Sequence, residues 1–187
     1  HRVLPLFMSA PDTGVGSGLH VHLSLHNCEG QPLFDSDGPD LTEAAQHVIA
    51  GLLTVLPSLA PLWAPTVNAY KRLTPGTCAP VNYSWGFDNR TCAIRIVGTG
   101  ARRHLEIRLP GADANPYNAL AAVLAGAGYG LDNKLVPPPP VDGNAVTDTD
   151  LPPVPRSLDE AQQLMSASEL AAQLLSTEVV QHYALAA

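Results

Sequence analysis

Polar and apolar residues alternate in two short segments that lie far apart in the chain, residues 19–25 and 104–109. Because successive side chains of a β-strand point to opposite faces, this alternation predicts two strands, each with one polar face. In the first segment the polar face carries His20, His22 and Ser24. Isolated histidines in this spacing occur more often on a solvent-exposed strand than in a metal or phosphate site, so the pattern alone leaves both interpretations open.

The polar face of the second segment carries an acid and a base, Glu106 and Arg108. Imidazole with carboxylate suits a divalent metal ion, and guanidinium suits phosphate. On its own, a glutamate two residues from an arginine is usually a cross-strand ion pair of little energetic value. If the two polar faces meet, they form a site for a metal ion and a phosphorylated ligand.

Further elements follow from apolar spacing. Residues 3–8 and 91–97 are predicted to be strands. Apolar positions between 41 and 56 recur at helical spacing, which predicts a helix with Asp40 as a possible cap and Pro57 as its end.

The second half of the chain combines loops and helices. Residues 68–86 are rich in Gly, Pro and Asn and are predicted to form an ordered loop. Asn115 and Pro116 open a helix that runs to about Lys134. Residues 136–156 are Pro-rich and acidic, which is typical of a surface loop. Two capping boxes begin the terminal helices expected over 157–187: Ser157 with Glu160, and Ser166 with Glu169.

Composition narrows the class of protein. The chain has 187 residues, 45% of them hydrophobic, which is enough for one domain with a core. The formal net charge of −7, without a basic stripe, argues against nucleic acid as a partner. The apolar runs are too interrupted to predict a membrane span. Three cysteines without CxxC spacing (Cys28, Cys78 and Cys92) indicate a reducing compartment and no structural zinc, so we expect a cytoplasmic protein.

Arginines cluster in one part of this acidic chain. Arg95 lies between two isoleucines, which places its side chain on the polar face of its predicted strand. The clustering is compatible with a phosphate or carboxylate site and, equally, with a solvated charged face. The cluster consists of Arg72, Arg90, Arg95, Arg102, Arg103 and Arg108.

Several motifs, in this order, resemble the glutamine synthetase family. They are Gly16 to Leu25; Lys71 to Gly76 followed by Ala79-Pro80; Asp88 to Thr91, Arg95 and Glu106 to Arg108; and Ala114 to Tyr117. The resemblance is continuous over 16–134 and weaker in the terminal helices. It implies an α+β fold, with a curved antiparallel sheet flanked by helices, and that residues 1–187 are the C-terminal part of a catalytic domain. The family's N-terminal β domain and the first part of the catalytic domain would precede His1, and the full protein would form a large homo-oligomeric ring.

The resemblance also implies a reaction and a set of roles. The family uses ATP to convert glutamate to γ-glutamyl phosphate, from which an amine displaces phosphate, with Mg²⁺ or Mn²⁺ as the divalent ion. By similarity, His20 and Glu106 are metal ligands. His22, Ser24 and Arg95 face the ATP phosphates. Gly16, Arg72, Arg90 and Arg108 bind glutamate, and the last two also hold the phosphoryl group.

Two positions depart from the family pattern. Cys78 occupies the catalytic position of a glutamate that closes the site and accepts a proton from ammonium, and Val15 replaces an asparagine. A thiol lacks the carboxylate's negative charge unless its pKa is strongly lowered. We therefore expect an acceptor other than ammonium, as in the γ-glutamylpolyamine and γ-glutamyl-amine synthetases of the family.

Other functions remain open at this stage. The chain could belong to a glutamine synthetase that uses ammonium, or to a catalytically inactive relative that serves as a sensor or assembly partner. A guanidino kinase shares the sheet architecture and the arginine-rich phosphate site. It is a more distant option, because its product would be a phosphagen. Because the family supplies further metal ligands from sequence before His1, we expect the isolated chain to be inactive.

Overall fold

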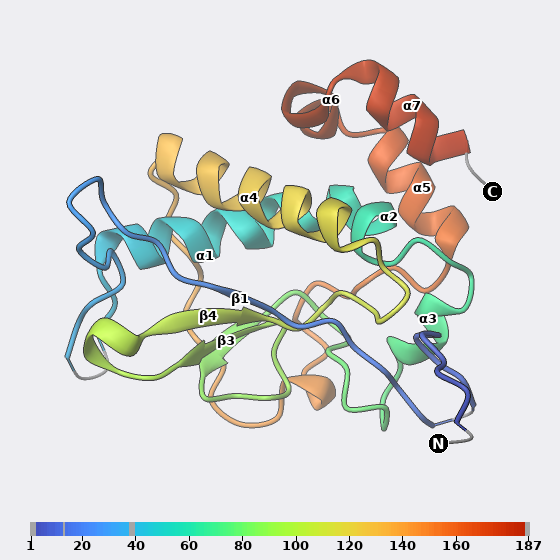
Figure 1. The fold of residues 1–187 in the computed structure, drawn as a ribbon, viewed down its shortest axis with the longest axis horizontal. Coiled ribbons are helices and arrows are strands. Elements are labelled where there is room, and N and C mark those ends of the chain that lie inside the picture. The colour runs from blue at the N-terminus through green and yellow to red at the C-terminus, as the bar shows by residue number, and fades with distance from the viewer. Residues whose placement is uncertain (1–2, 13, 38–39, 186–187) are drawn as a thin grey trace.

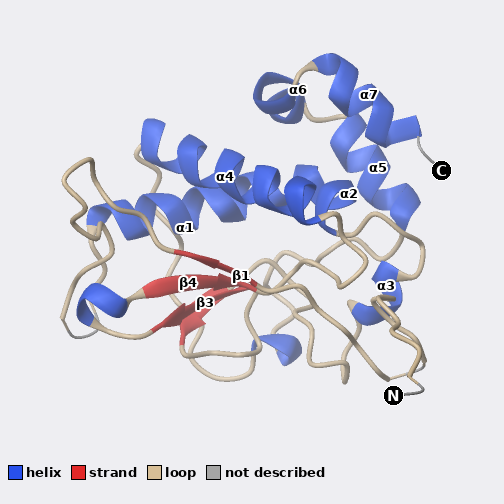
Figure 2. Cartoon of the chain, in the orientation of Figure 1, coloured by secondary structure: helices blue, strands red, loops and turns tan. Residues whose placement is uncertain are grey.

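The structure is a computed structural model that describes residues 3–12, 14–37 and 40–185. Helices form one layer and a small sheet forms the other, with long loops beyond the sheet (Figures 1 and 2). The strand predicted over 3–8 is wrong, because this segment has no strand pairing in the structure. Its apolar side chains are exposed, with Leu4 at 90% and Phe7 at 72%.

The sheet has four strands among the described residues, in the order β1-β4-β3-β2. They are β1 (Val21–Leu23), β2 (Trp85–Phe87), β3 (Ile94–Val97) and β4 (His104–Ile107). β4 pairs antiparallel with both β1 and β3, whereas β2 and β3 are parallel. The α+β class is confirmed, and the parallel pair is a difference from the antiparallel sheet that was expected. A short connection joins β2 to β3, and Asp88 at its start adopts a φ of 46°.

The helices on the sheet are α1 (Glu43–Val55), the 3₁₀ helix η1 (Leu56–Leu59), α2 (Ala60–Trp63) and α4 (Pro116–Asp132). Their apolar sides and the inner face of the sheet form one core that includes Leu52, Ile94 and Ile107, all fully buried. Two expectations are corrected here. Thr42, not Asp40, caps α1, because its side chain accepts the Ala45 amide. Pro57 does not end the helical segment, because proline is tolerated in the first turn of η1.

Glycines set the distance between α1 and α4. A Cβ at Gly51 would lie 2.1 Å from the Gly126 carbonyl oxygen, and one at Gly130 would lie 2.0 Å from the His47 carbonyl oxygen. Both distances are far below van der Waals contact, so the backbones touch because these residues lack side chains. This close packing seats α4 on the sheet beside α1.

The segment Glu43–Trp63 has the length and apolar composition of a membrane span, with a mean hydropathy of 1.4. Within the fold, 67% of that window is buried. A central helix in the core of a globular protein has the same length and apolar composition, so this segment is not evidence of a membrane span.

The Pro-rich residues 136–156, which we call the strap, run beside β2. Their short 3₁₀ helix is η3 (Ala145–Thr147). The Val141 amide donates to the Trp85 carbonyl oxygen at 2.9 Å, and the Trp85 indole donates to the Pro138 carbonyl oxygen at 2.8 Å. The strap is therefore fastened to the sheet edge along part of its length.

Three helices end the chain: α5 (Leu158–Ser166), α6 (Glu169–Leu175) and α7 (Thr177–Leu185). The first predicted cap is confirmed, because the Ser157 side chain accepts the Glu160 amide. The second is wrong: Ser168 caps α6, and Ser166 lies in the last turn of α5, where its hydroxyl donates to a backbone carbonyl oxygen. Two shorter helices complete the fold, α3 (Ala69–Arg72) in the loop predicted over 68–86 and η2 (Gly100–Arg102) before β4.

Candidate functional site

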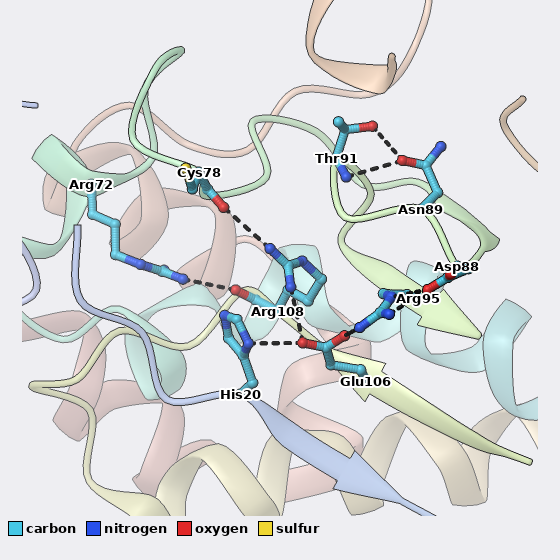
Figure 3. Close-up of polar contacts among 9 residues, drawn as sticks. All are labelled: His20, Arg72, Cys78, Asp88, Asn89, Thr91, Arg95, Glu106 and Arg108. Atoms are coloured by element: carbon cyan, nitrogen blue, oxygen red, sulfur yellow. Dashed lines mark hydrogen bonds and ion pairs between the residues drawn. The ribbon is translucent and has the colours of Figure 1, made fainter. Parts of the chain in front are cut away.

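Glu106 is the centre of the polar cluster on the outer face of the sheet (Figure 3). Its Oε1 lies 2.9 Å from the Nδ1 of His20 and 2.9 Å from the Nη1 of Arg108. Its Oε2 accepts from the Nη1 of Arg95 at 2.7 Å. The carboxylate thus joins three basic side chains, from β3, from the residue after β4 and from the residue before β1, while its own side chain is only 6% exposed.

Strand register explains how these residues meet. Cα pairing places His22 opposite Glu106 on one side and Arg95 opposite Glu106 on the other. Directly opposed residues in an antiparallel pair share a face, so the polar faces of β1, β3 and β4 become continuous. The two alternating segments of the sequence therefore meet as expected.

Electrostatics keep Glu106 ionised and His20 neutral. Burial works against the charged carboxylate, but the hydrogen bond from Arg95 and the charges of Arg108 and His20 bring the pKa of Glu106 below its ordinary 4.5. Burial, followed by the charge of Arg108, lowers the pKa of His20 below 6.5 despite its contact with Glu106. These are the protonation states in which both side chains can ligate a metal ion.

Both shifts make the stability of the chain depend on pH in the same direction. A lowered pKa means that the folded state binds fewer protons than the unfolded state, so the stabilisation is present at high pH and is lost as the pH falls. In metal-free buffer, the free energy of unfolding should decrease from pH 6.5 downward through His20, and again below pH 4.5 through Glu106. Urea unfolding at about pH 7.5 and about pH 5 would measure the first step. His20→Gln should reduce that step, whereas His182→Gln, at an exposed position, should not; an unchanged step in both variants would contradict the assignment.

Arg108 connects Glu106 to the loop that precedes β2. Its Nη2 donates to the carbonyl oxygen of Cys78 at 3.2 Å. The residue is only 5% exposed, yet its buried Nε has no hydrogen-bond partner among the described residues. A buried guanidinium N–H without an acceptor is costly, so the arrangement favours an acidic ligand at this point.

Arg72, at the end of α3, fastens the same loop to the sheet. Its guanidinium donates to the carbonyl oxygens of Leu109 at 2.8 Å and of Arg108 at 2.9 Å. Burial, followed by the charge of Arg108, lowers the pKa of Arg72 to about 10, so it remains cationic at neutral pH. In this structure its Nη atoms bind backbone rather than facing an open site.

The glycines before β1 allow this loop to approach. A Cβ at Gly16 would lie 2.9 Å from the carbonyl oxygen of Thr77, and one at Gly18 would lie 2.7 Å from the Nη2 of Arg72. A side chain at Gly16 would press on the backbone of the loop, and one at Gly18 would press on the guanidinium of Arg72. Gly16, predicted to bind substrate, therefore lies directly beside the loop that carries Arg72.

Other predicted site residues lie outside the Glu106 network. His22 and Ser24 are exposed on the outer face of the β1 segment, and the His22 ring lies 5.1 Å from that of His104. Arg90 is exposed and contributes to lowering the pKa of Asp88. The Cys78 side chain is exposed, and it is the backbone carbonyl of this residue that contacts Arg108.

Sequence reasoning did not assign a role to Asp88. Its carboxylate accepts from Arg95, including a contact to Nε at 2.9 Å, and the hydrogen bond from Arg95 lowers its pKa. Arg95 therefore spans an exposed and a buried carboxylate. The available signal was an aspartate that lies just after the loop predicted over 68–86 and precedes Arg95 by seven residues, which is too general to identify the pair in advance.

Metal binding can be tested against the donor atoms. Among the described residues no group of three His, Cys, Asp or Glu side chains gathers in one place. His20 and Glu106 supply an imidazole and a carboxylate in contact, which fits two positions of a divalent-ion site but does not complete one. Further ligands from outside these residues would be required.

Comparison with known proteins finds matches over nearly the whole chain. A family model described as the catalytic domain of glutamine synthetase matches residues 1–186. The chain is 41% identical over 177 residues to a γ-glutamylethanolamide synthetase, GlnA4, of Streptomyces coelicolor, covering 95% of this chain and 38% of that protein. It is 38% identical to a glutamate–isopropylamine ligase of a Pseudomonas species, covering 98% of this chain and 41% of the relative. A glutamine synthetase of Thermus thermophilus is 35% identical, with 98% and 43% covered.

Solved structures also match this chain over nearly its whole length. A complex described as GmaS with ADP superimposes with a TM-score of 0.85 at 32% identity, covering 96% of this chain and 43% of that one. The ligand-free form of GmaS gives a TM-score of 0.83. The chain thus spans about two fifths of the length of the relatives that it matches.

Proposed function

Because the chain belongs to the glutamine synthetase catalytic-domain family, whose members among its relatives are ligases, we propose that it is part of an ATP-dependent enzyme that joins glutamate to an amine. The observation that carries the proposal is the buried Glu106 cluster. It combines a carboxylate, an imidazole and two guanidinium groups on one face of the sheet.

The chemistry requires several negative groups to approach one another. Glutamate must attack the γ-phosphate of ATP to give γ-glutamyl phosphate and ADP, and an amine then forms the amide and releases phosphate. Mg²⁺ or Mn²⁺, when bound, neutralises charge on the phosphate oxygens. His20 and Glu106 would hold one such ion together with ligands from elsewhere in the enzyme. His22, Ser24 and Arg95 lie on the nucleotide side of this arrangement.

Arg108 and its neighbours form the acidic-substrate side. The unpartnered Nε of Arg108 offers a fixed, buried donor for a carboxylate or phosphoryl oxygen. Such preorganised donors stabilise developing charge without having to reorganise. Arg90, exposed beside Asp88, would complete the phosphoryl contacts, and Arg72 with Gly16 would line the glutamate end of the site.

The acceptor that we propose is an amine other than ammonium. Cys78 places a thiol where the family pattern has a carboxylate, and this exposed side chain leaves the entrance less negative. A small cation such as ammonium depends more on that charge than an amine with an apolar body does. The names of two relatives, an ethanolamide synthetase and an isopropylamine ligase, support this choice.

An acceptor panel tests the function and its specificity together. With ATP, glutamate and Mg²⁺, the full-length ligase should release ADP with ethanolamine, isopropylamine or putrescine more rapidly than with ammonium. Cys78→Glu should shift the preference toward ammonium by about tenfold in kcat/KM, because it restores a carboxylate near the cation. Cys28→Glu, at another exposed cysteine, is the matched control. A clear preference for ammonium in the unchanged enzyme would overturn the acceptor proposal, and inactivity with all amines would favour a sensor or assembly role.

Four further features belong to the same proposal. The full-length enzyme forms a large homo-oligomeric ring, acts in the cytoplasm and binds neither nucleic acid nor membrane. The described residues do not by themselves complete a metal site, and the isolated chain is inactive. Light scattering of the full-length enzyme and turnover assays of the purified chain test the first and last of these.

A further inference from the structure

The segment between Arg72 and Cys78, which we call the 72–78 loop, folds around one hydroxyl group. Thr77 is only 8% exposed. Its Oγ1 lies 2.7 Å from the Thr74 carbonyl oxygen and also contacts the carbonyl oxygen of Arg72. The hydroxyl has one proton and donates to one of these acceptors at a time, and either bond holds the loop in a tight turn.

The turn is confined from the other side by the backbone before β1. A Cβ at Gly16 would lie 2.9 Å from the Thr77 carbonyl oxygen and 3.2 Å from the Cγ of Arg72. Thr77 therefore lies between its own loop and Gly16. A move of the loop toward Gly16 is blocked. From within, the buried Thr77 hydroxyl ties the loop, whereas the hydroxyl of the exposed Thr74 ties only its start, to the Lys71 carbonyl oxygen.

Both ends of the loop meet Arg108. At one end, the Nη2 of Arg72 donates to the Arg108 carbonyl oxygen at 2.9 Å. At the other, the Cys78 carbonyl oxygen accepts from the Nη2 of Arg108 at 3.2 Å. Cys78 has a φ of 61°, a left-handed conformation that is unfavourable for a residue with a Cβ and persists only where its surroundings impose it.

We propose that Thr77 is a positioning residue: its hydroxyl holds the 72–78 loop closed, and the closed loop orients Arg108 through the Cys78 carbonyl oxygen. The hydroxyl itself touches no substrate. By fixing one Nη of Arg108, the loop holds the guanidinium in the orientation in which its buried Nε has no partner among the described residues. The effect on catalysis rests on the proposed function, whereas the closure of the loop by Thr77 does not.

Limited trypsin digestion of the full-length protein, with cleavage read site by site by mass spectrometry, tests the closure. Lys71 and Arg72 are cleavage sites at the start of the loop, and Arg72 is only 3% exposed. Thr77→Val keeps the shape of the side chain and removes the hydroxyl, so it should speed cleavage after these two residues by about fivefold, the change expected for one net hydrogen bond. Thr77→Ser should cleave as the unchanged chain does.

Cleavage after Lys134, an exposed residue that follows α4 and does not line the cavity beside the 72–78 loop, is the internal control. Equal acceleration at Lys134 and at the loop, or no acceleration at either, would overturn the proposal. If Thr77→Val fails to fold, Gly16→Ala decides the question, because its methyl group pushes against the same carbonyl oxygen from outside. Selective cleavage of the loop in that variant supports closure, and uniform cleavage refutes it.

Kinetics of the full-length ligase test the consequence for Arg108. Thr77→Val should raise the KM for glutamate about fivefold with a smaller change in kcat, and Thr77→Ser should restore it. Faster loop cleavage without a change in KM would show that closure does not act on Arg108. An enzyme without ligase activity would defeat the proposed function but leave the digestion result to decide the role of Thr77.

Discussion

Replacing Glu106 with glutamine should lower the free energy of unfolding by about 3 kcal/mol, the lower end of what breaking a buried ion pair costs. Glutamine keeps the shape of the side chain and one acceptor oxygen. It removes the negative charge that His20, Arg95 and Arg108 share, and the side chain it replaces is only 6% exposed. Arg108 would then lose its carboxylate partner, and Arg95 would keep only the exposed Asp88.

Urea unfolding of the chain at neutral pH measures this effect. Glu29→Gln changes an exposed glutamate in a turn and should alter stability by less than about 0.5 kcal/mol. In the full-length ligase, Glu106→Gln should also weaken the dependence on Mg²⁺, since a carboxylate ligand is lost. An unchanged midpoint in urea would mean that the carboxylate is not the element that holds the cluster together.

Replacing Arg108 with lysine should reduce kcat/KM of the full-length ligase by about 10²- to 10³-fold, the range found when one preorganised donor to a developing charge is removed. Lysine preserves the charge but offers no planar fork. It cannot contact Glu106 and the Cys78 carbonyl oxygen together while also directing a third N–H to a ligand. The loss should therefore appear in turnover as well as in the KM for glutamate.

Arg102→Lys provides the matched control, because this arginine is exposed in η2 and lies outside the Glu106 cluster. Its kcat/KM should remain within about twofold of the unchanged enzyme. Thermal unfolding of both variants separates loss of function from loss of fold. Near-normal turnover in the folded Arg108→Lys enzyme would remove Arg108 from the proposed acidic-substrate site.

The site was more predictable from the sequence than the edges of the fold were. Period-two alternation depends only on the geometry of a strand, so His20 and Glu106 could be placed on polar faces before the structure was known. Their meeting required a register that no local pattern encodes. The direction of β2 and the absence of pairing over 3–8 depend on segments that are distant in the sequence. The β-strand propensity of a segment does not specify those partners.

Helix boundaries show the same limit. Thr42 and Asp40 are both good caps by residue type, and only the path of the chain selects Thr42. The contact of Arg72 with backbone carbonyl oxygens could not be foreseen, because arginine is usually expected to seek a carboxylate or phosphate. The roles of Thr77 and Asp88 follow from turns that bring them beside Arg72 and Arg95, and a sequence pattern does not contain that geometry.

The two edges of the sheet differ in their protection against aggregation. The strap covers β2 and contributes prolines, which cannot donate a backbone hydrogen bond to an incoming strand. β1 forms the opposite edge, and no described strand pairs with its outer side. The exposed apolar side chains of residues 3–8 are a second surface that favours association between copies of the chain. Aggregation of the chain by itself would therefore begin at β1 and at residues 3–8, and charged substitutions within 3–8 should reduce it.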